Sequence, residues 1–271
     1  MRIVEEIMDY KLIAIDLDDT LLKNDLTISE RARRAIKASI SKGTLVTFAT
    51  GRMYRSALPY ALELGLDLPL ITYQGALVKY ADGREVYHRP LDLNIAKEVI
   101  NFVKPFGLHI NAYIDDELYM EDATDWGKKY ASIAKVPVHF MQLPRELKND
   151  PTKILIIGES EELDRLALKL QKYFLEAINI TKSKEHFLEI SHPRATKGNA
   201  LKELAESLNI KREQVMAIGD NMNDLDMIKY AGCGVAVGNA VEDLKNIADV
   251  VSKSNDDDGV AEVIENMVLK A

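Results

Sequence analysis

Three carboxylates follow a short apolar run near the start of the sequence, in LIAIDLDDTLL (12–22). Asp16 and Asp18 stand two residues apart where this run ends, so in an extended chain both side chains face the same side. Carboxylates held close together repel one another, and burial strengthens the repulsion. The pattern therefore indicates that a cation balances the charge here.

Two other polar clusters follow apolar runs in the same way. The first is Thr50, Gly51 and Arg52, after LVTFAT (45–50). The second is GDNMND, which follows VMAI and supplies Asp220, Asn221, Asn223 and Asp224. In a parallel α/β sheet, functional groups gather beyond the carboxyl ends of the strands. Mg²⁺ suits such a site better than zinc, because hard cations prefer oxygen ligands and no Cys or His stands beside these acids.

Strand-like and helix-like runs alternate at both ends of the chain, which predicts an α/β fold with a doubly wound, Rossmann-like parallel sheet. The predicted strands are LIAIDL (12–17), LVTFAT (45–50), PLITYQ (69–74), VMAIGD (215–220) and CGVAV (233–237). The segment 27–43 is predicted to be a helix, with Thr27 and Glu30 in capping-box spacing and Gly43 at its end. Further helices are predicted at 197–209 and 223–231.

The middle of the chain has a different pattern, with pairs of strands between helices. LVKYADGREVYH (77–88) predicts a hairpin, with Asp82 and Gly83 in a type I′ turn. INITKS (178–183) and FLEIS (187–191) predict neighbouring strands. We therefore expect an inserted α+β cap domain at 88–189, between a first core segment at 1–87 and a second at 190–271.

The overall composition excludes several classes of function. The 271 residues carry a formal net charge of -8, which argues against nucleic acids and anionic membranes as partners. Cys233 is the single cysteine, so an intramolecular disulfide and a thiolate zinc cluster are excluded. The first ten residues include acids and no long apolar block, which predicts a cytoplasmic protein without a signal peptide. The sequence does not indicate an oligomeric state.

Four motifs appear in a fixed order: DLDDT (16–20), ATGR (49–52), the lysine of ATKGNAL (195–201) and GDNMND (219–224). In this order and spacing the chain resembles phosphatases of the haloacid dehalogenase (HAD) superfamily. The long insertion and SNDDDGVAEVI (254–264) are similar to the Cof-like, or HAD-IIB, branch. The resemblance implies a Mg²⁺-dependent phosphatase of small phosphorylated metabolites, with sugar phosphates as the first expectation.

The resemblance also implies a role for individual residues. Asp16 matches the nucleophile that forms an aspartyl-phosphate, and Asp18 matches the general acid/base, whose backbone carbonyl also contacts the metal. Lys197 matches the cation that neutralises charge on the nucleophile and the phosphoryl group. The implied metal ligands are Asp16, Asp18, Asp220 and Asp224. The implied phosphate or substrate contacts are Leu17, Thr50, Gly51, Lys197 and Asn223.

Two other functions use the same chemistry. A sugar phosphomutase would pass the phosphoryl group to a second hydroxyl, and the motifs do not separate it from a phosphatase. A signalling module that keeps its aspartyl-phosphate as a switch is disfavoured by the acid at Asp18 and by the insertion. Gln74 stands where the family often has Asn, so the sequence does not name the substrate.

Asp19 and two acidic groups outside the motifs are expected to have no catalytic role. Asp19 is expected to point away from its neighbours. The acidic residues 115–117 are expected to form a solvated turn, and residues 256–258 to precede a helix, where acids suit the positive end.

Overall fold

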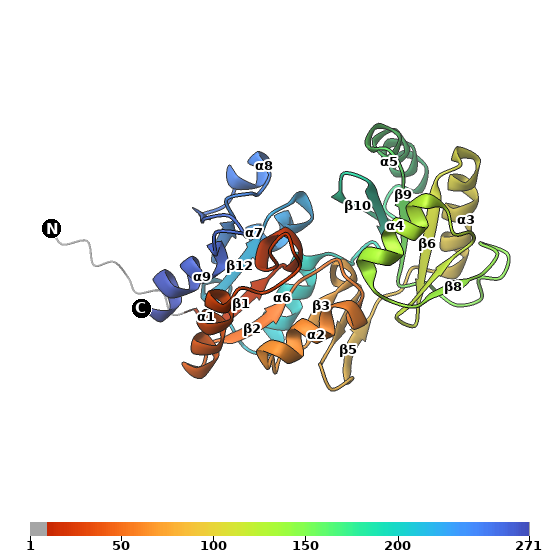
Figure 1. The fold of residues 1–271 in the computed structure, drawn as a ribbon. Helices are drawn as coiled ribbons and strands as arrows, with labels where there is room; N and C mark the ends of the chain where they lie inside the picture. Colours follow the sequence, from red (N-terminus) through yellow and green to blue (C-terminus); the bar gives the residue numbers. More distant parts are fainter. Residues whose placement is uncertain (1–9, 271) are drawn as a thin grey trace.

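The computed structural model describes residues 10–270 as two large sheets with a smaller one beside the first (Figure 1). The first large sheet has the strand order β14-β13-β12-β1-β2, and neighbouring strands in it are parallel. Its strands are β1 (Leu12–Ile15), β2 (Leu45–Phe48), β12 (Val215–Gly219), β13 (Cys233–Ala236) and β14 (Val250–Val251). The predicted doubly wound parallel sheet is confirmed.

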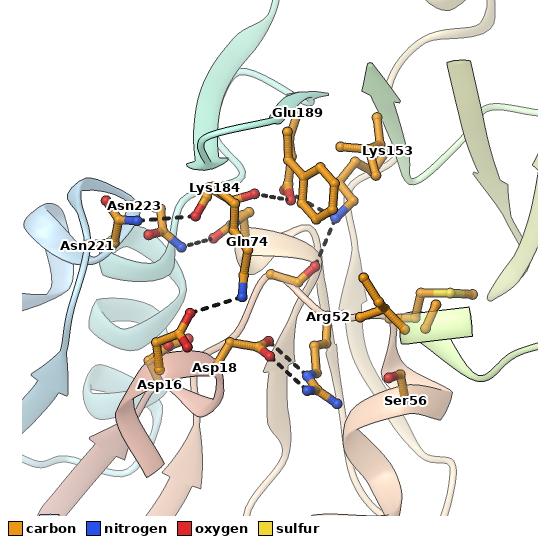
Figure 2. A pocket seen from close by; sticks show the side chains of 18 of the residues that line it. Asp16, Asp18, Arg52, Ser56, Gln74, Lys153, Lys184, Glu189, Asn221 and Asn223 are labelled. Atoms are coloured by element: carbon orange, nitrogen blue, oxygen red, sulfur yellow. Dashed lines mark hydrogen bonds and ion pairs between the residues drawn. The ribbon is translucent and has the colours of Figure 1, made fainter. Parts of the chain in front are cut away.

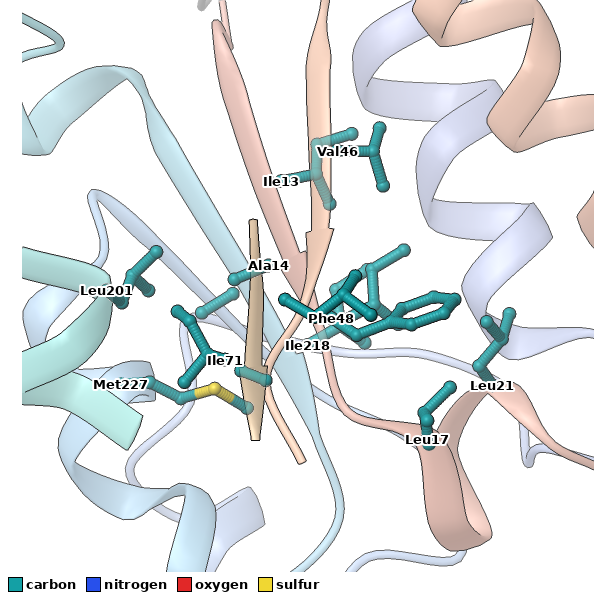
Figure 3. Packing of buried hydrophobic residues seen from close by; sticks show 14 of the residues in the cluster. Ile13, Ala14, Leu17, Leu21, Val46, Phe48, Ile71, Leu201, Ile218 and Met227 are labelled. Atoms are coloured by element: carbon teal, nitrogen blue, oxygen red, sulfur yellow. The ribbon is translucent and has the colours of Figure 1, made fainter. Parts of the chain in front are cut away.

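Helices cover both faces of this core sheet, as Figure 3 shows. Apolar residues alternate between the two faces of β1, so Ile13 packs toward α1 and α9 while Ala14 packs toward α6 and α7. Burial on both faces explains why β1 and β12 are apolar throughout. The core helices are α1 (Glu30–Ser41), α2 (Tyr54–Leu64), α6 (Lys197–Ser207), α7 (Leu225–Tyr230), α8 (Glu242–Lys245) and α9 (Gly259–Ile264).

The N-cap of helix α1 lies two residues later than Thr27, the N-cap of the predicted capping box. Its N-cap is Ser29, whose hydroxyl accepts a hydrogen bond from the Ala32 amide at 3.0 Å. Thr27 instead bonds Asp25 in the preceding loop, so the capping box of Thr27 and Glu30 was a wrong prediction. Both hydroxyl residues are good caps, and the choice between them depends on which one starts the buried face.

The small sheet consists of β3 (Leu70–Thr72), β4 (Leu77–Lys79) and β5 (Glu85–His88), paired antiparallel. One parallel bridge, between Ala49 and Ile71, connects β3 to the core. The strand predicted at 69–74 is shorter than expected, because β3 covers Leu70–Thr72 alone. The predicted hairpin at 77–88 is confirmed. Its turn is not type I′, because that type needs positive φ at both central residues and, of Asp82 and Gly83, only Gly83 has it (φ 91).

The second large sheet belongs to the inserted region and has the order β10-β11-β9-β6-β7-β8. Its strands are β6 (His109–Ile114), β7 (Glu117–Met120), β8 (Val138–Phe140), β9 (Lys153–Ile157), β10 (Asn179–Lys184) and β11 (Phe187–Ser191). The accompanying helices are α3 (Leu93–Val103), α4 (Asp125–Ala134) and α5 (Ser160–Phe174). An α+β cap was predicted here and is present; its boundaries at residues 88 and 189 stay a prediction.

The two faces of the cap sheet differ. On β9 and β11 the residues Ile154, Ile156, Leu188 and Ile190 belong to a hydrophobic cluster that includes α3 and α5. The residues between them are Lys153, Leu155, Phe187 and Glu189, and these line a cavity between cap and core. Strand alternation thus gives the cap one face for packing and one for contact with the core.

The turn between β6 and β7 contacts the core. Asp116 accepts hydrogen bonds from the Tyr73 hydroxyl at 2.6 Å and from the Arg55 amide at 2.8 Å, and Glu117 pairs with the Arg55 guanidinium. The solvated acidic turn expected at 115–117 was therefore wrong for Asp116 and Glu117, although Asp115 is exposed.

Among the described residues, no helix is both long and apolar enough to cross a bilayer.

Candidate active site

The cavity between the two domains opens over the carboxyl ends of β1 and β12 (Figure 2). Core and cap both contribute to its lining. The core provides Asp16, Asp18, Gly51, Arg52, Gln74, Asp220 and Asn223, and the cap provides Tyr130, Lys153, Ser183, Lys184, Phe187 and Glu189. Residues from the first, second and fourth motifs, far apart in the sequence, therefore meet at one site.

Lys197 is the first residue of α6, and its side chain is fully buried beneath the cavity. Its Nζ donates to Asp16 Oδ1 at 2.6 Å and to Asp224 Oδ1 at 2.5 Å. An ammonium without access to water is stable only when carboxylates pair with it, as these two do. The third motif is thus joined to the first and the fourth, and Asp16 Oδ2 is left free of Lys197.

Asp16, Asp220 and Asp224 form the group of carboxylates that could hold a metal ion, with ligand atoms all within 4.8 Å of one another. Asp220 Oδ1 also accepts a hydrogen bond from the Thr20 hydroxyl at 3.1 Å. Asp224 Oδ2 accepts from the amides of Asp220 at 3.0 Å and Asn221 at 3.1 Å, so this carboxylate orients the loop.

Gly219 makes this arrangement possible, because a Cβ at that position would lie 2.6 Å from the Asp224 carboxyl group.

The charges at the site are not balanced by the protein alone. Burial raises the pKa of Asp16 to about 7, with Lys197 acting in the opposite direction. Burial and the neighbouring carboxylates Asp224 and Asp16 raise the pKa of Asp220 to about 9. Both groups thus retain protons that an additional cation would displace.

Mg²⁺ fits this set of donors. The ion prefers carboxylate oxygens and keeps several of its own waters, so few protein ligands are needed. Asp16 and Asp220 each have one oxygen without a side-chain hydrogen bond among the described residues, whereas both oxygens of Asp224 already accept hydrogen bonds. This geometry supports Asp16 and Asp220 as direct ligands and Asp224 as a residue that holds them in place.

Asp18 lies outside that group and forms a two-point ion pair with Arg52. The guanidinium donates to Asp18 from Nε at 2.8 Å and from Nη2 at 2.7 Å. Burial alone would raise the pKa of Asp18, but the hydrogen bonds and charge of Arg52 lower it. A metal contact from Asp18 would therefore come from its backbone carbonyl, as the sequence resemblance implied.

The predicted phosphate contacts are distributed unevenly. Gly51 and Asn223 line the cavity. Thr50 is fully buried and is not among the residues that line the cavity. Its hydroxyl accepts a hydrogen bond from the Arg52 amide at 3.1 Å. The side chain of Leu17 belongs to the core cluster (Figure 3), so only its backbone could reach a phosphate. Their roles stay predictions.

Gln74, which stands where the family often has Asn, lines the cavity. Its backbone has φ 57, and its side chain is 2% exposed. Gln74 Oε1 accepts from Asn223 Nδ2 at 3.3 Å, and Nε2 is buried without a hydrogen-bond partner among residues 10–270. A Cβ on Gly51 would come within 2.4 Å of Nε2, so the Gln74 amide occupies the space beside the backbone of Gly51.

Three contacts join the cap to the site from above (Figure 2). Lys184 Nζ donates to Asp19 at 2.9 Å, Asn221 Nδ2 donates to the Ser183 carbonyl at 3.2 Å, and Lys153 Nζ donates to the Gly51 carbonyl at 2.8 Å. Asp19 was expected to point away, but its φ of 58 turns the chain so that its carboxylate reaches the cap.

The sequence of the whole core and cap matches one family. Residues 13–264 match the family model of haloacid dehalogenase-like hydrolases. The chain belongs to this family. YitU of Bacillus subtilis, named 5-amino-6-(5-phospho-D-ribitylamino)uracil phosphatase, is 31% identical over 259 residues, covering 94% of this chain and 96% of YitU. The family and its phosphatase relatives confirm the prediction of a phosphatase.

Solved structures of family members have the same fold. TM0651 of Thermotoga maritima is 37% identical, and the match covers 94% of this chain and 97% of TM0651 with a TM-score of 0.82. BT4131, described as a HAD subclass IIB sugar phosphatase, is 22% identical, with a TM-score of 0.84 over 94% of this chain and 98% of BT4131. At that identity the second match supports the subclass IIB fold alone.

Proposed function

We propose that this phosphatase hydrolyses phosphate monoesters of small metabolites through an aspartyl-phosphate on Asp16, with Mg²⁺ as cofactor. The observation that carries the proposal is the buried arrangement of Asp16. Lys197 holds Oδ1 at 2.6 Å, and the second oxygen remains available within the group that includes Asp220 and Asp224. A carboxylate fixed in this way has one oxygen to attack with and little freedom to turn.

The residues around Asp16 support two proton transfers. When Asp16 attacks phosphorus, its bond to phosphorus forms and the bond to the leaving oxygen breaks, so that oxygen needs a proton. Asp18 donates this proton in its acid form, then accepts one from the water that attacks the aspartyl-phosphate. Arg52, which lowers the pKa of Asp18, favours the second transfer and opposes the first.

Charge neutralisation completes the mechanism. Lys197 offsets the negative charge of Asp16 and of the phosphoryl group in a site without bulk water, where electrostatic interactions are strong. Bound Mg²⁺ would offset the remaining charge on the carboxylates and on a phosphate oxygen. The cap contacts at Gly51, Asp19 and Asn221 would keep water out while the phosphorylated Asp16 persists.

Among possible substrates, sugar phosphates remain the first expectation. YitU acts, by its name, on a phosphorylated ribitylamino-uracil, which also presents a polyol phosphate to its enzyme. A phosphomutase would use the same residues, and the phosphatase relatives favour transfer to water. This geometry does not support a signalling role, because Asp18 lines the same cavity as Asp16 and could assist hydrolysis of an aspartyl-phosphate there. A cytoplasmic location stays a prediction.

The test is phosphate release from p-nitrophenyl phosphate and a panel of sugar and polyol phosphates, with and without Mg²⁺, for the parent and for Asp16→Asn. We expect Asp16→Asn to lower turnover of every ester by roughly four orders of magnitude or more. Asp67→Asn, at an exposed position of the core, is the matched control and should leave turnover unchanged. Undiminished hydrolysis by Asp16→Asn would disprove the nucleophile, and isomerised sugar phosphate without free phosphate would establish the mutase.

A further inference from the structure

A buried pair of opposite charges lies on the cap side of the cavity, across from Asp18 and Arg52 (Figure 2). Lys153 on β9 and Glu189 on β11 have side chains that are 3% and 6% exposed, with Nζ and Oε2 3.1 Å apart. Both residues line the cavity with the active-site carboxylates. Charged side chains this deeply buried are rare in a folded domain unless something requires them.

Packing of the cap sheet does not require this pair. The residues that alternate with Lys153 and Glu189 pack on the far face of the sheet, in the cluster with α3 and α5. On the cavity face their neighbours are Leu155 and Phe187, which are apolar. Apolar residues of similar volume would stabilise such a position at least as well as an ion pair. The charges therefore point to a use in the cavity itself.

The hydrogen bonds of the pair leave one acceptor free. Glu189 Oε1 accepts from the Ser183 hydroxyl at 2.8 Å. Glu189 Oε2 is buried and has no partner in hydrogen-bond geometry among the described residues, although the Lys153 ammonium is near. Lys153 instead directs a hydrogen bond to the Gly51 carbonyl at 2.8 Å. The ion pair at 3.1 Å lacks hydrogen-bond geometry, so this oxygen can still accept a hydrogen bond from a donor on a ligand.

We propose that Glu189 is a specificity-determining residue of this phosphatase and accepts a hydrogen bond from a hydroxyl group of the leaving group. The inference rests on the proposed function and adds a substrate class to it: phosphates of polyols or sugars with a hydroxyl close to the phosphoester. Lys153 pairs with Glu189 and ties it to the loop that contains Gly51. The carboxylate thus has a fixed position relative to the bound phosphate.

Such a site rejects a leaving group that lacks the hydroxyl. A hydroxyl on the leaving group would give Glu189 Oε2 a donor, whereas an alkyl chain would leave that oxygen without one. The parent enzyme should therefore prefer ribitol 5-phosphate to n-pentyl phosphate, which has the same number of carbons and no hydroxyls. We expect the ratio of kcat/KM for these two esters to be roughly 10- to 100-fold.

The experiment compares the parent and Glu189→Gln on both esters and on p-nitrophenyl phosphate. The variant keeps the shape of the side chain and removes its charge, so the preference for ribitol 5-phosphate should fall by roughly tenfold, mostly through KM. Turnover of n-pentyl phosphate should change less than about threefold. Glu161→Gln on α5, whose side chain is 90% exposed, is the control and should retain the parent ratio.

Each other outcome counts against the inference. Equal losses on both esters would make Glu189 a structural residue, and a parent without preference would remove the proposed hydrogen bond. Thermal unfolding of each variant separates these results from misfolding. Absence of turnover for all three esters by the folded parent would instead refute the proposed phosphatase function on which the inference rests.

Discussion

Core and cap each contain a buried lysine paired with carboxylate, and the two lysines have different surroundings. Lys197 lies at the start of a core helix, between Asp16 and Asp224, below the carboxyl ends of parallel strands. Lys153 lies on the face of an antiparallel part of the cap sheet, beside Glu189. Lys197 is positioned by α6, which it begins, and by the separate segments that carry Asp16 and Asp224. Lys153 is positioned by the alternation of side chains along β9.

This difference separates the chemistry from the choice of substrate. The strand ends of the core bring together the groups that every phosphate ester needs, so a change there affects all substrates alike. By the proposal, the cavity face of the cap would meet the part of the substrate that varies, so a change there should alter the order of preference among substrates.

The largest expected effects come from replacing each lysine by Met. Each replacement leaves a buried carboxylate without its partner and should lower the free energy of unfolding by about 3–5 kcal/mol. Lys197→Met should also abolish hydrolysis of every ester, whereas Lys153→Met should retain turnover of p-nitrophenyl phosphate within about tenfold. Urea unfolding and phosphate release measure the two effects.

Lys172→Met, at an exposed position of α5, is the control for both lysine variants. The comparison between core and cap would be wrong if Lys197→Met hydrolysed some esters normally, or if Lys153→Met lost all of them.

The second prediction concerns how Mg²⁺ and pH change the free energy of unfolding, an effect that we expect to come from the carboxylates of the core. Burial raises the pKa of Asp16 to about 7 and that of Asp220 to about 9. The folded chain therefore binds protons there more tightly than the unfolded chain, whose carboxyl groups titrate near a pKa of about 4. Without the ion, the free energy of unfolding should fall as pH rises from about 4 to about 9.

Mg²⁺ competes with those protons, so it should stabilise the protein more at pH 8 than at pH 5. With the ion at about 100 times its dissociation constant, the gain at pH 8 is about 2.7 kcal/mol. Thermal unfolding at both pH values, with NaCl at matched ionic strength, gives the measurement. Equal stabilisation at both pH values, or none, would rule out a site at Asp16 and Asp220.

The smallest expected effect comes from Arg52→Gln. Arg52 lowers the pKa of Asp18, so its removal should raise that pKa. A larger fraction of Asp18 is then protonated at neutral pH, and the alkaline limb of the kcat/KM profile should move to higher pH. Arg52→Lys keeps the charge and should shift the limb less. An unmoved profile would mean that Asp18 is not the acid.

The core sheet and the meeting of the motif residues at one cavity could be predicted because their signals are local. Four motifs each follow a strand or begin a helix, and the parallel sheet brings the strand ends together whatever the intervening sequence. Details that depend on competition between neighbours were predicted less well. Ser29 and Thr27 are equally good caps by type, and Asp82 and Gly83 fit two kinds of hairpin turn.

The contribution of the cap could not be predicted, because it depends on tertiary contacts. Asp116 becomes a docking residue only because Tyr73 and Arg55 lie opposite. Lys153 and Glu189 did leave a signal, since each is a lone charge within a strand that is otherwise largely apolar. Opposite charges in two such strands could have indicated a buried pair, but only the register of β9 and β11 brings them to one face.

The alternation of β9 and β11 has a consequence for how such enzymes diversify after gene duplication. Leu155, Phe187 and Glu189 lie on the cavity face of these strands, opposite Ile154 and Leu188, which hold the sheet to its helices. A duplicated gene could therefore gain activity on a new metabolite through single replacements on this cavity face, while the residues of the core site stay the same.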